Sequence, residues 1–318
     1  MTVGEIKTKT LHEMREYASG GEAISDTDNK DYLLSVVPLI NLFQNEIATQ
    51  QNAIYATYPI AQNNPENQLG TSWYEGLVHS SEDISYSATG SQAYSFQVCG
   101  TATVYIEEET AEDTWTTLDT ISHTDSTGYT TYKDIITASD IENDIRIRFS
   151  GSYRYQYRYV ALFAEAFPDD DSVPPYLPAV PYDLPTTFFR LDRVDWTHQN
   201  GIMENYAAYR FETYGKSSKR IYLPYSTSGE VNVHYYAYPT FITEPSASDL
   251  TTQDDTVLDL PDEYEPTLVH RISAALLRDE EPYLADTFNN EYFVGMNAHI
   301  GNRPQDNGIE TPINTSNW

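Results

Sequence analysis

Apolar residues recur at helical spacing in four segments, two near each end of the chain. Residues 2–17 and 31–50 form the first pair, and residues 263–278 and 282–296 form the second. Each segment predicts an amphipathic helix, whose apolar stripe must be buried against another element. The long stretch before residue 263 offers the second pair no helical neighbour. We therefore expect the two ends of the chain to fold together into one helical domain, with everything between them inserted into it.

Local signals support these helix boundaries. Thr2 and Glu5 have the spacing of a capping box, and Gly20-Gly21 ends the first segment. Pro38 lies inside the second segment and is expected to kink or restart it. The side chains predicted to form the core of the helical domain are Ile6, Met14, Leu39, Phe43, Leu268, Ile272, Leu276, Leu284 and Phe288.

Between residues 75 and 165 the apolar pattern changes to a period of two, which is typical of half-buried strands. Six short candidate strands, separated by turns rich in Gly, Ser, Asp and Thr, occupy residues 92–98, 102–108, 114–121, 130–135, 144–150 and 155–163. Short, evenly spaced strands predict an antiparallel β-sandwich. Residues 61–72, which precede it, are expected to form a loop.

A proline-rich segment follows the sandwich. Residues 168–187 contain six prolines, which predicts an extended, semi-rigid linker and a domain boundary. Four more candidate strands lie beyond this segment. We expect the last two, residues 219–225 and 230–238, to form a hairpin through residues 226–229.

The predicted fold is therefore α+β. It consists of a small helical bundle built from both chain ends, an inserted antiparallel β-sandwich and a second small β region. The corresponding divisions are residues 1–60 plus 175–300 for the helical body with its β-hairpin region, 75–165 for the sandwich and 301–318 for an extended tail.

The charge of the chain limits its partners. It has 318 residues, of which 48 are acidic and 18 basic, giving a net charge of −30. Such a surface repels nucleic-acid phosphates. An acidic surface suits a protein that works in high salt, where the repulsion between its own charges is screened within about 3 Å at 1 M salt. It also suits a protein that lines a channel through which DNA passes without binding. No apolar run reaches the length of a membrane span, and the N-terminal segment carries charges where a signal peptide needs apolar residues. We expect no membrane partner.

Catalytic signatures are absent from the sequence. His12-Glu13 lacks the second helical histidine of a zinc protease, and there is no nucleophile elbow, phosphate-binding loop or dinucleotide fingerprint. Cys99 is the only cysteine, so it cannot form an intramolecular disulfide and is expected to be a small buried hydrophobe. The acidic runs 107–110 and 169–172 are expected to be solvated loops. We predict no enzyme activity, no metal and no cofactor.

One strand combines tyrosines and arginines in alternation. Alternation places the tyrosines of residues 153–159 on one face and the arginines on the other. The favoured interpretation is that the tyrosine face packs inward and the arginines pair with nearby carboxylates. The alternative is a contact surface for sugars or a partner, formed by Tyr153, Arg154, Tyr155, Tyr157, Arg158 and Tyr159.

The two chain ends together resemble a known family. The N-terminal MTVGEIKTKTLHEM, the helix ending in QNEIAT and the later LDLPDEYEPTLVHRISAALLRDEEPYLADTFNNEYF are similar to head-to-tail connector (adaptor) proteins of tailed double-stranded DNA viruses. The resemblance covers roughly residues 1–60 and 175–300 and is a pattern over helices rather than a short motif. Residues 75–165 resemble galactose-binding or jelly-roll sandwiches, which some connectors carry as an insertion.

This resemblance implies a structural virion protein. Its copies would form a ring, typically a dodecamer, between the portal protein and a tail or stopper protein. The genome would pass through the channel without sequence-specific binding, and the insertion could contact the capsid or glycans. The ring would belong to the neck of the virion and be assembled in the cytoplasm of a halophilic host. The tail would dock on the portal through its apolar anchors, which are Ile309, Pro312, Ile313 and Trp318.

Two other functions are compatible with the sequence. The first is a carbohydrate- or receptor-binding virion protein that acts through the sandwich. The second is a hydrolase hidden among the many carboxylates, whose spacing carries no information in so acidic a chain.

Overall fold

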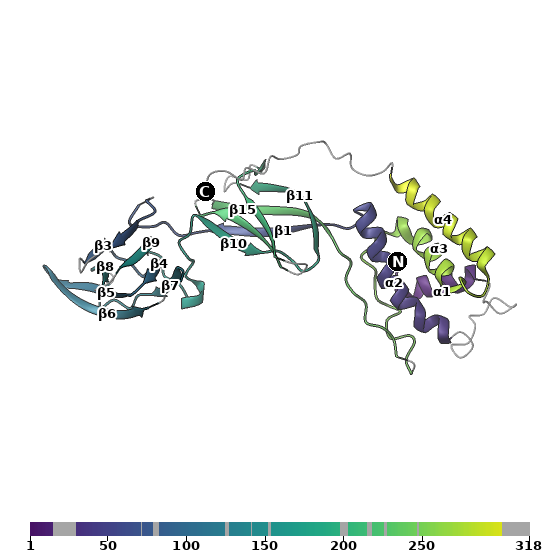
Figure 1. The fold of residues 1–318 in the computed structure, drawn as a ribbon, viewed down its shortest axis with the longest axis horizontal. Helices are drawn as coiled ribbons and strands as arrows, with labels where there is room; N and C mark the ends of the chain where they lie inside the picture. The colour runs from purple at the N-terminus through teal and green to yellow at the C-terminus, as the bar shows by residue number, and fades with distance from the viewer. Residues whose placement is uncertain are drawn as a thin grey trace.

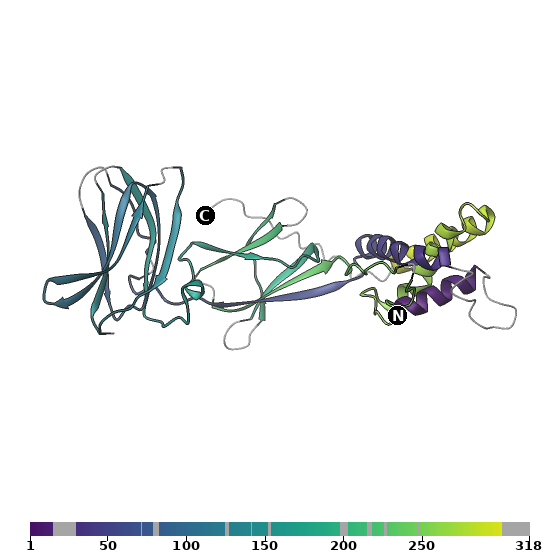
Figure 2. The same cartoon turned by 90° about the horizontal axis from the view of Figure 1, so that it is seen from below.

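Three bodies follow one another along the longest axis of the protein (Figures 1 and 2). A helical body lies at one end, a β body in the middle and a β-sandwich at the other end. The chain leaves the helical body, reaches the sandwich and returns, so the fold is α+β with an inserted sandwich, as predicted. The computed structural model describes residues 1–14, 30–70, 72–78, 83–124, 127–140, 142–151, 154–197, 203–214, 218–225, 228–246 and 248–300.

The helical body is built from both ends of the chain. Its helices are α1 (Val3–Glu13), α2 (Lys30–Gln51), α3 (Glu265–Leu276) and α4 (Pro282–Ile300), with a short 3₁₀ helix, η2 (Asp262–Tyr264), before α3. The side chain of Thr2 accepts a hydrogen bond from the backbone of Glu5, whose carboxylate accepts one from Thr2, so the predicted capping box is present. One buried cluster draws side chains from all four helices, so neither end has a complete core alone.

The structure places the predicted core residues in two clusters. Ile6, Phe43, Leu268 and Ile272 are buried in the main cluster, where Leu39 and Leu276 are partly buried. Met14 is buried in a smaller cluster beside Leu277, and Leu284 and Phe288 pack against it while remaining partly exposed. Loss of solvent-exposed apolar surface across these clusters is what holds the two chain ends together.

The middle body consists of two sheets that share one core. Strands β1 (Tyr55–Asn63), β15 (Ser228–Ala237), β11 (Phe188–Thr197) and β12 (Met203–Asn205) form the first sheet in that order. Strands β10 (Ala179–Asp183), β14 (Ser218–Pro224) and β13 (Arg210–Tyr214) form the second. Strand β1 pairs antiparallel with β15, from the pair Tyr55 and Tyr236 to the pair Asn63 and Ser228. Because β1 follows α2 and β15 leads back toward α3, the two strands form one arm that extends from the helical body.

Three predictions for this region are wrong. The proposed hairpin does not form, because β14 pairs with β10 and β13 whereas β15 pairs with β1 and β11. Residues 61–63 belong to β1 rather than to a loop; Pro59 is tolerated there because β1 is an edge strand. The proline-rich segment is not a simple linker, since it contains a 3₁₀ helix, η1 (Asp170–Ser172), and strand β10.

The sandwich consists of two four-stranded antiparallel sheets. One has the order β2 (Glu75–Val78), β9 (Tyr155–Phe163), β4 (Ala93–Gly100), β7 (Thr130–Ile135). The other has the order β3 (Ile84–Thr89), β8 (Asp144–Ser150), β5 (Ala102–Ala111), β6 (Thr114–His123). All six predicted strands are present, whereas β2 and β3 were not anticipated.

The sandwich packs directly against the middle body. A buried cluster joins Phe163 of β9 to Val180 of β10 and to Tyr176 and Tyr225 beside them. The Tyr225 hydroxyl donates to the carbonyl of Pro65 at 3.0 Å. Lys133 of β7 donates to the carbonyls of Asp170, Asp171 and Val173 at 3.4, 2.9 and 2.5 Å. These contacts fix the direction in which the sandwich projects from the arm.

Candidate interaction surfaces

Helix α4 presents large apolar side chains to solvent. Tyr283, Val294 and Phe293 are 93%, 64% and 52% exposed. The sequence of α4 places Tyr283, Thr287, Asn290, Val294 and Asn297 at successive spacings of four and three residues, which is one face of a helix. We call these five residues and Phe293 the α4 ridge. Asp286 is exposed on the same face, three residues after Tyr283 and four before Asn290, so the apolar side chains of the ridge stand beside one carboxylate.

The opposite face of α4 is buried against α3 and α2. Its Tyr292 and Met296 belong to the main core, and the Tyr292 hydroxyl donates to Glu46 Oε1 at 2.8 Å. Gly295 allows close approach to α3, because a Cβ at this position would lie closer than 3.0 Å to Thr267 Oγ1. Helix α4 is thus apolar on its buried face, and its exposed face carries three large apolar side chains among polar ones.

Two more exposed apolar side chains lie beside α2, at a recess that is lined mainly by polar residues. Gln44 and residues 240–243, 253 and 256–259 line this recess of about 260 Å³, which includes Phe241 and Val257 with exposed fractions of 71% and 68%. We call this the α2 recess. Of its ten lining residues only Asp259 is charged, and its carboxylate accepts a hydrogen bond from the backbone of Thr240 at 2.7 Å. Asn41 holds the recess in shape, since its side chain donates to and accepts from the backbone of Ile242 at 2.8 and 2.9 Å.

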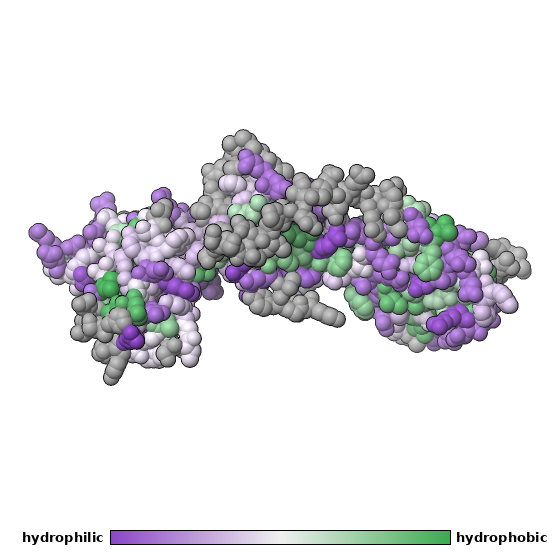
Figure 3. Space-filling model, turned by 45° about the horizontal axis from the view of Figure 1, so that its top comes forward, coloured by the Kyte–Doolittle hydropathy of each residue, from purple (hydrophilic) through white to green (hydrophobic). Residues whose placement is uncertain are grey.

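Helix α4 and the segment that follows β15 and lines the α2 recess lie on different sides of α3 (Figures 1 and 2). Figure 3 shows hydrophobic residues gathered on the α4 side of the helical body. The two surfaces can therefore be occupied at the same time by different molecules.

Strand β9 corrects the predicted contact surface of the sandwich. Tyr155 and Tyr157 are buried in the sandwich core, so the favoured inward packing is observed and these two tyrosines are not a contact surface. Burial raises the pKa of the Tyr155 hydroxyl to about 12. Arg154 is exposed, and Tyr153 lies outside the described residues.

A bulge takes Tyr159 out of the predicted alternation. The pairing of β9 with β4 shifts between Ser95 and Gln97, and Tyr159 adopts a φ of 56°. A bulge with a bulky residue at positive φ is strained and re-aims its side chain. Tyr159 therefore packs with Ala161 and Phe163 on the outer face of the sheet, not with the core that holds Tyr157.

This outer face combines aromatic rings with polar groups. The guanidinium carbon of Arg158 lies 3.7 Å from the ring centroid of Tyr129 and 4.7 Å from that of Tyr159. Its Nε donates to Gln97 Oε1 at 2.7 Å. Trp73 packs edge-on against Tyr159 with centroids 5.9 Å apart. We call Trp73, Tyr129, Arg158 and Tyr159 the aromatic strip; the sequence pattern indicated only the last two of them.

The acidic run of residues 107–110 lies in strand β5, and its first two carboxylates are buried, so the predicted solvated loop is wrong for this run. Hydrogen bonds from Arg148 and Arg146 lower the pKa of the buried Glu107 carboxyl against the effect of burial. Burial opposes ionisation of Glu108, yet hydrogen bonds from Asn143, Ser139 and Asp140 lower its pKa to about 2. Both carboxylates therefore stay ionised and hold the sandwich together.

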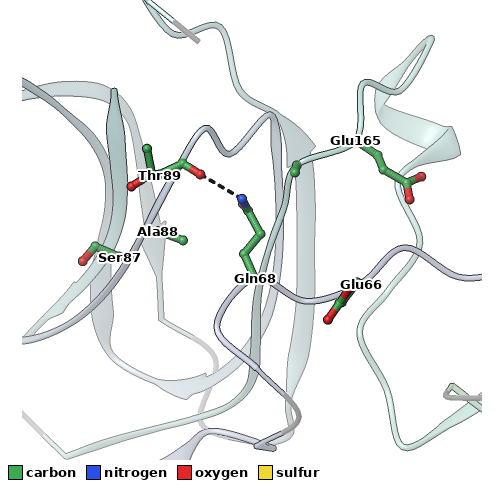
Figure 4. Close-up of a pocket in the computed structure, with 7 residues that line it drawn as sticks. Glu66, Gln68, Ser87, Ala88, Thr89 and Glu165 are labelled. Atoms are coloured by element: carbon green, nitrogen blue, oxygen red, sulfur yellow. Dashed lines mark hydrogen bonds between the residues drawn. The ribbon is translucent and has the colours of Figure 1, made fainter. Parts of the chain in front are cut away.

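A cleft lies between the sandwich and the segments that enter and leave it. Its volume is about 640 Å³, and it is lined by Glu66, Gln68, Ser87, Ala88, Thr89, Ala164 and Glu165 (Figure 4). Gln68 crosses it to donate to the carbonyl of Thr89 at 2.8 Å. Glu165 points away from Gln68 in Figure 4. None of the seven lining residues is a histidine, cysteine, lysine or arginine.

Other candidate chemistry in the sequence is dispersed. Within the described ranges, no group of three or more His, Cys, Asp or Glu side chains is placed to hold a metal ion, and no helix is long and apolar enough to cross a bilayer. Cys99 is half-buried rather than fully buried. The proposed tail anchors Ile309, Pro312, Ile313 and Trp318 lie outside the described residues.

No protein-family model matches the chain, and no curated protein matches its sequence. Among solved structures it is similar to a family 6 carbohydrate-binding module, with 14% identity, a TM-score of 0.23 and coverage of 34% of this chain and 94% of that one. It is also similar to the PBSX exported protein XepA (13% identity, TM-score 0.24, 54% and 88% coverage). A third is a mitogen from Yersinia pseudotuberculosis (9% identity, TM-score 0.22, 33% and 93% coverage).

These likenesses are weak. The carbohydrate-binding modules among them are β-sandwich folds that cover about a third of the chain. They give no support to a connector family.

Proposed function

We propose that this protein is a non-catalytic structural subunit of a viral neck, an adaptor whose copies form a ring between the portal and the tail of a tailed double-stranded DNA virus. The observation that carries the proposal is the helical body, which is assembled from both chain ends and exposes large apolar side chains at two places, on α4 and beside α2. A monomer that acts alone has no use for two such surfaces. The antiparallel arm of β1 and β15 would hold the sandwich away from the ring.

The mechanism we propose is multivalent docking. Weak contacts repeated around a ring become strong because each bound subunit raises the effective concentration of the next. The apolar anchors of the C-terminal tail would dock on the portal, and a stopper or tail protein would bind below. Genomic DNA would pass through the channel without being held, since a net charge of −30 repels phosphate. The same charge favours a halophilic host, in whose cytoplasm the neck would be assembled.

The test is reconstitution with the portal protein of the same virus. The purified protein and the portal are mixed in molar KCl and imaged by electron microscopy. We expect a ring of this protein on the tail-proximal side of the portal. A matched variant that ends at residue 300 should lose portal binding while retaining its helical circular dichroism. A protein that stays monomeric and ignores the portal under these conditions would refute the proposal.

A second candidate function is carbohydrate binding by the sandwich, and the aromatic strip is the observation that favours it. Aromatic rings stack on the apolar faces of sugars, and guanidinium and amide groups bind sugar hydroxyls. Screening the full-length protein on a glycan array in high salt tests this function. Trp73→Ala should abolish any sugar-specific binding, whereas Trp115→Ala, on the other sheet, should retain it. Binding that survives Trp73→Ala would exclude the strip as the site.

A further inference from the structure

Arg158 differs from the other arginines in the strands of the sandwich, because no described carboxylate neutralises it. Arg146 and Arg148 each bind Glu107, at 2.6 and 2.7 Å. Glu75 is opposite Arg158 where β2 pairs with β9, but no carboxylate oxygen of the described residues lies within 4.0 Å of the guanidinium nitrogens. In a chain with 48 acidic and 18 basic residues, a half-buried arginine of this kind indicates a site for an anion from outside the chain.

The Arg158 guanidinium is held in place without its terminal nitrogens. Its Nε donates to Gln97 Oε1 at 2.7 Å, and the Gln97 amide donates to Thr131 Oγ1 at 2.8 Å. The ring centroids of Tyr129 and Tyr159 lie 3.7 and 4.7 Å from the guanidinium carbon, and cation–π attraction adds to the hold. No hydrogen bond between described residues uses the two terminal nitrogens. They form a planar fork that matches the two oxygens of a carboxylate.

An aromatic ring that suits a sugar lies beside this fork. Trp73 is 38% exposed, and Tyr176 stacks on one face of the indole with centroids 4.6 Å apart, which fixes its orientation. The Trp73 ring and the Arg158 guanidinium carbon lie 5.9 and 4.7 Å from the centre of the Tyr159 ring. A sugar ring can therefore pack on the exposed part of the indole while a carboxylate on the same or the next sugar residue reaches the guanidinium.

We infer that the aromatic strip binds an acidic sugar, a sugar residue that carries a carboxylate, such as a uronic acid. Arg158 binds the carboxylate through its terminal nitrogens, and Trp73 packs on the sugar ring. This inference rests on the second candidate function, carbohydrate binding by the sandwich, and names the class of sugar.

Glu75 opposes this contact. It is exposed and lies opposite Arg158 on the adjacent strand, so its carboxylate repels that of the sugar. The net charge of −30 adds repulsion from the whole chain, which molar salt screens beyond about 3 Å. Glu75→Gln should therefore strengthen the binding of an acidic sugar by about two- to fivefold and leave the binding of a neutral sugar unchanged.

Matched sugars test the class of ligand. The full-length protein is titrated in molar KCl with trisaccharides of glucuronic acid and of galacturonic acid, and with the same trisaccharides after reduction of their carboxyl groups to hydroxymethyl groups. We expect the acidic member of at least one pair to bind about tenfold more tightly than its reduced counterpart, because the reduced sugar lacks the charge-assisted bidentate contact. A polyglutamate peptide, which carries carboxylates but no sugar ring, should not bind.

Variants of Arg158 test its role. Arg158→Gln should remove the preference for the acidic sugar, and Arg158→Lys should restore it only in part, because an ammonium group lacks the planar fork. Arg190→Gln is the matched control, since it removes an exposed arginine that packs on Tyr236 in the middle body. It should bind the acidic sugar as the unchanged protein does. Far-UV circular dichroism and thermal melts verify that the variants remain folded.

Cys99 gives a readout that needs no variant. It is the only cysteine, is half-buried and lies opposite Gln156 where β4 pairs with β9. Gln156 accepts a hydrogen bond from the Tyr129 hydroxyl at 2.7 Å, and strand alternation places Cys99 on the same face of β4 as Gln97. An acidic sugar bound over Arg158 should therefore slow the alkylation of Cys99 by N-ethylmaleimide more than the reduced sugar does.

Three outcomes would overturn the inference. They are equal affinity for the acidic and the reduced sugars, a preference that survives Arg158→Gln, and equally tight binding of polyglutamate. Sugar binding that is lost on Trp73→Ala but shows no preference for the carboxylate would leave carbohydrate binding standing. Absence of binding to any sugar would refute the second candidate function as well. The adaptor ring is tested separately, on the portal.

Discussion

The contact of Gly295 with Thr267 offers a sharp test of how α4 is held against α3. An alanine Cβ at position 295 would lie closer than 3.0 Å to Thr267 Oγ1, 3.3 Å from its Cβ and 3.4 Å from its Cγ2. Thr267 is 3% exposed and β-branched, so its side chain has little freedom to move away. Gly295→Ala therefore forces the two helices apart or strains them.

The magnitude follows from two opposing effects. Overpacking at a buried contact costs about 1–3 kcal/mol, whereas replacing a helical glycine by alanine stabilises a helix by about 1 kcal/mol. Because the overlap with Thr267 is severe, the upper end of the overpacking cost applies, and we expect Gly295→Ala to lower the free energy of unfolding of the helical body by about 2 kcal/mol. In a Thr267→Ala background only the 3.3 Å contact with Cβ remains. There the same substitution should be neutral or stabilising by up to about 1 kcal/mol.

The assay is urea denaturation in high salt, followed by far-UV circular dichroism, for the four proteins of this double-mutant cycle. Asn290→Ala is the control, because Asn290 is exposed on α4 and its replacement should raise helix propensity without a clash. An equal effect of Gly295→Ala in both backgrounds, or no loss in the wild-type background, would show that the close contact of α3 and α4 is wrong.

Three further predictions address the other parts of the molecule. Ile6→Ala and Leu268→Ala should each destabilise the same unfolding transition by about 2–5 kcal/mol, since both side chains are fully buried in one cluster. Calorimetry measures the transitions, with Ile147→Ala in the sandwich as the control, and separate transitions for the two variants would contradict a shared core. The pKa of Glu108, lowered to about 2, provides about 3 kcal/mol of stability that is present above pH 4.5 and is lost as the pH falls towards 2. The melting temperatures of the protein and of Glu108→Gln should therefore differ less at low pH than at neutral pH, and a constant difference would refute this. Self-association measured by ultracentrifugation should rise with KCl concentration, and a fall would indicate an ion-paired interface instead.

The helices and most of the sandwich could be predicted because their signals are local. The capping box of Thr2 and Glu5 and the helical periodicity of the four segments depend on neighbours within a few residues. The alternation in residues 92–163 likewise identifies six strands before any pairing is known. The union of both chain ends follows from the need to bury apolar stripes that have no closer partner.

Strand pairing and surface exposure depend on contacts that are distant in sequence. The sequence pattern favours a hairpin of the strands that became β14 and β15, yet β14 pairs with the preceding strand β13 and with β10, whereas β15 pairs with β1 and β11. Strand β1 contains Pro59, Gln62 and Asn63, which weaken the sequence signal of a strand, and no local signal gives its partner β15.

What the sequence by itself determined is the set of elements, their apolar faces, the acidic character of the surface and the assembly of the helical body from both ends. Only the tertiary structure decided which apolar residues stay exposed. Tyr159 leaves the core because a bulge in β9 turns it outward, and the α2 recess exists because Asn41 binds the backbone of Ile242. Periodicity reports whether a side chain can be buried, whereas three-dimensional packing determines whether another part of the chain covers it.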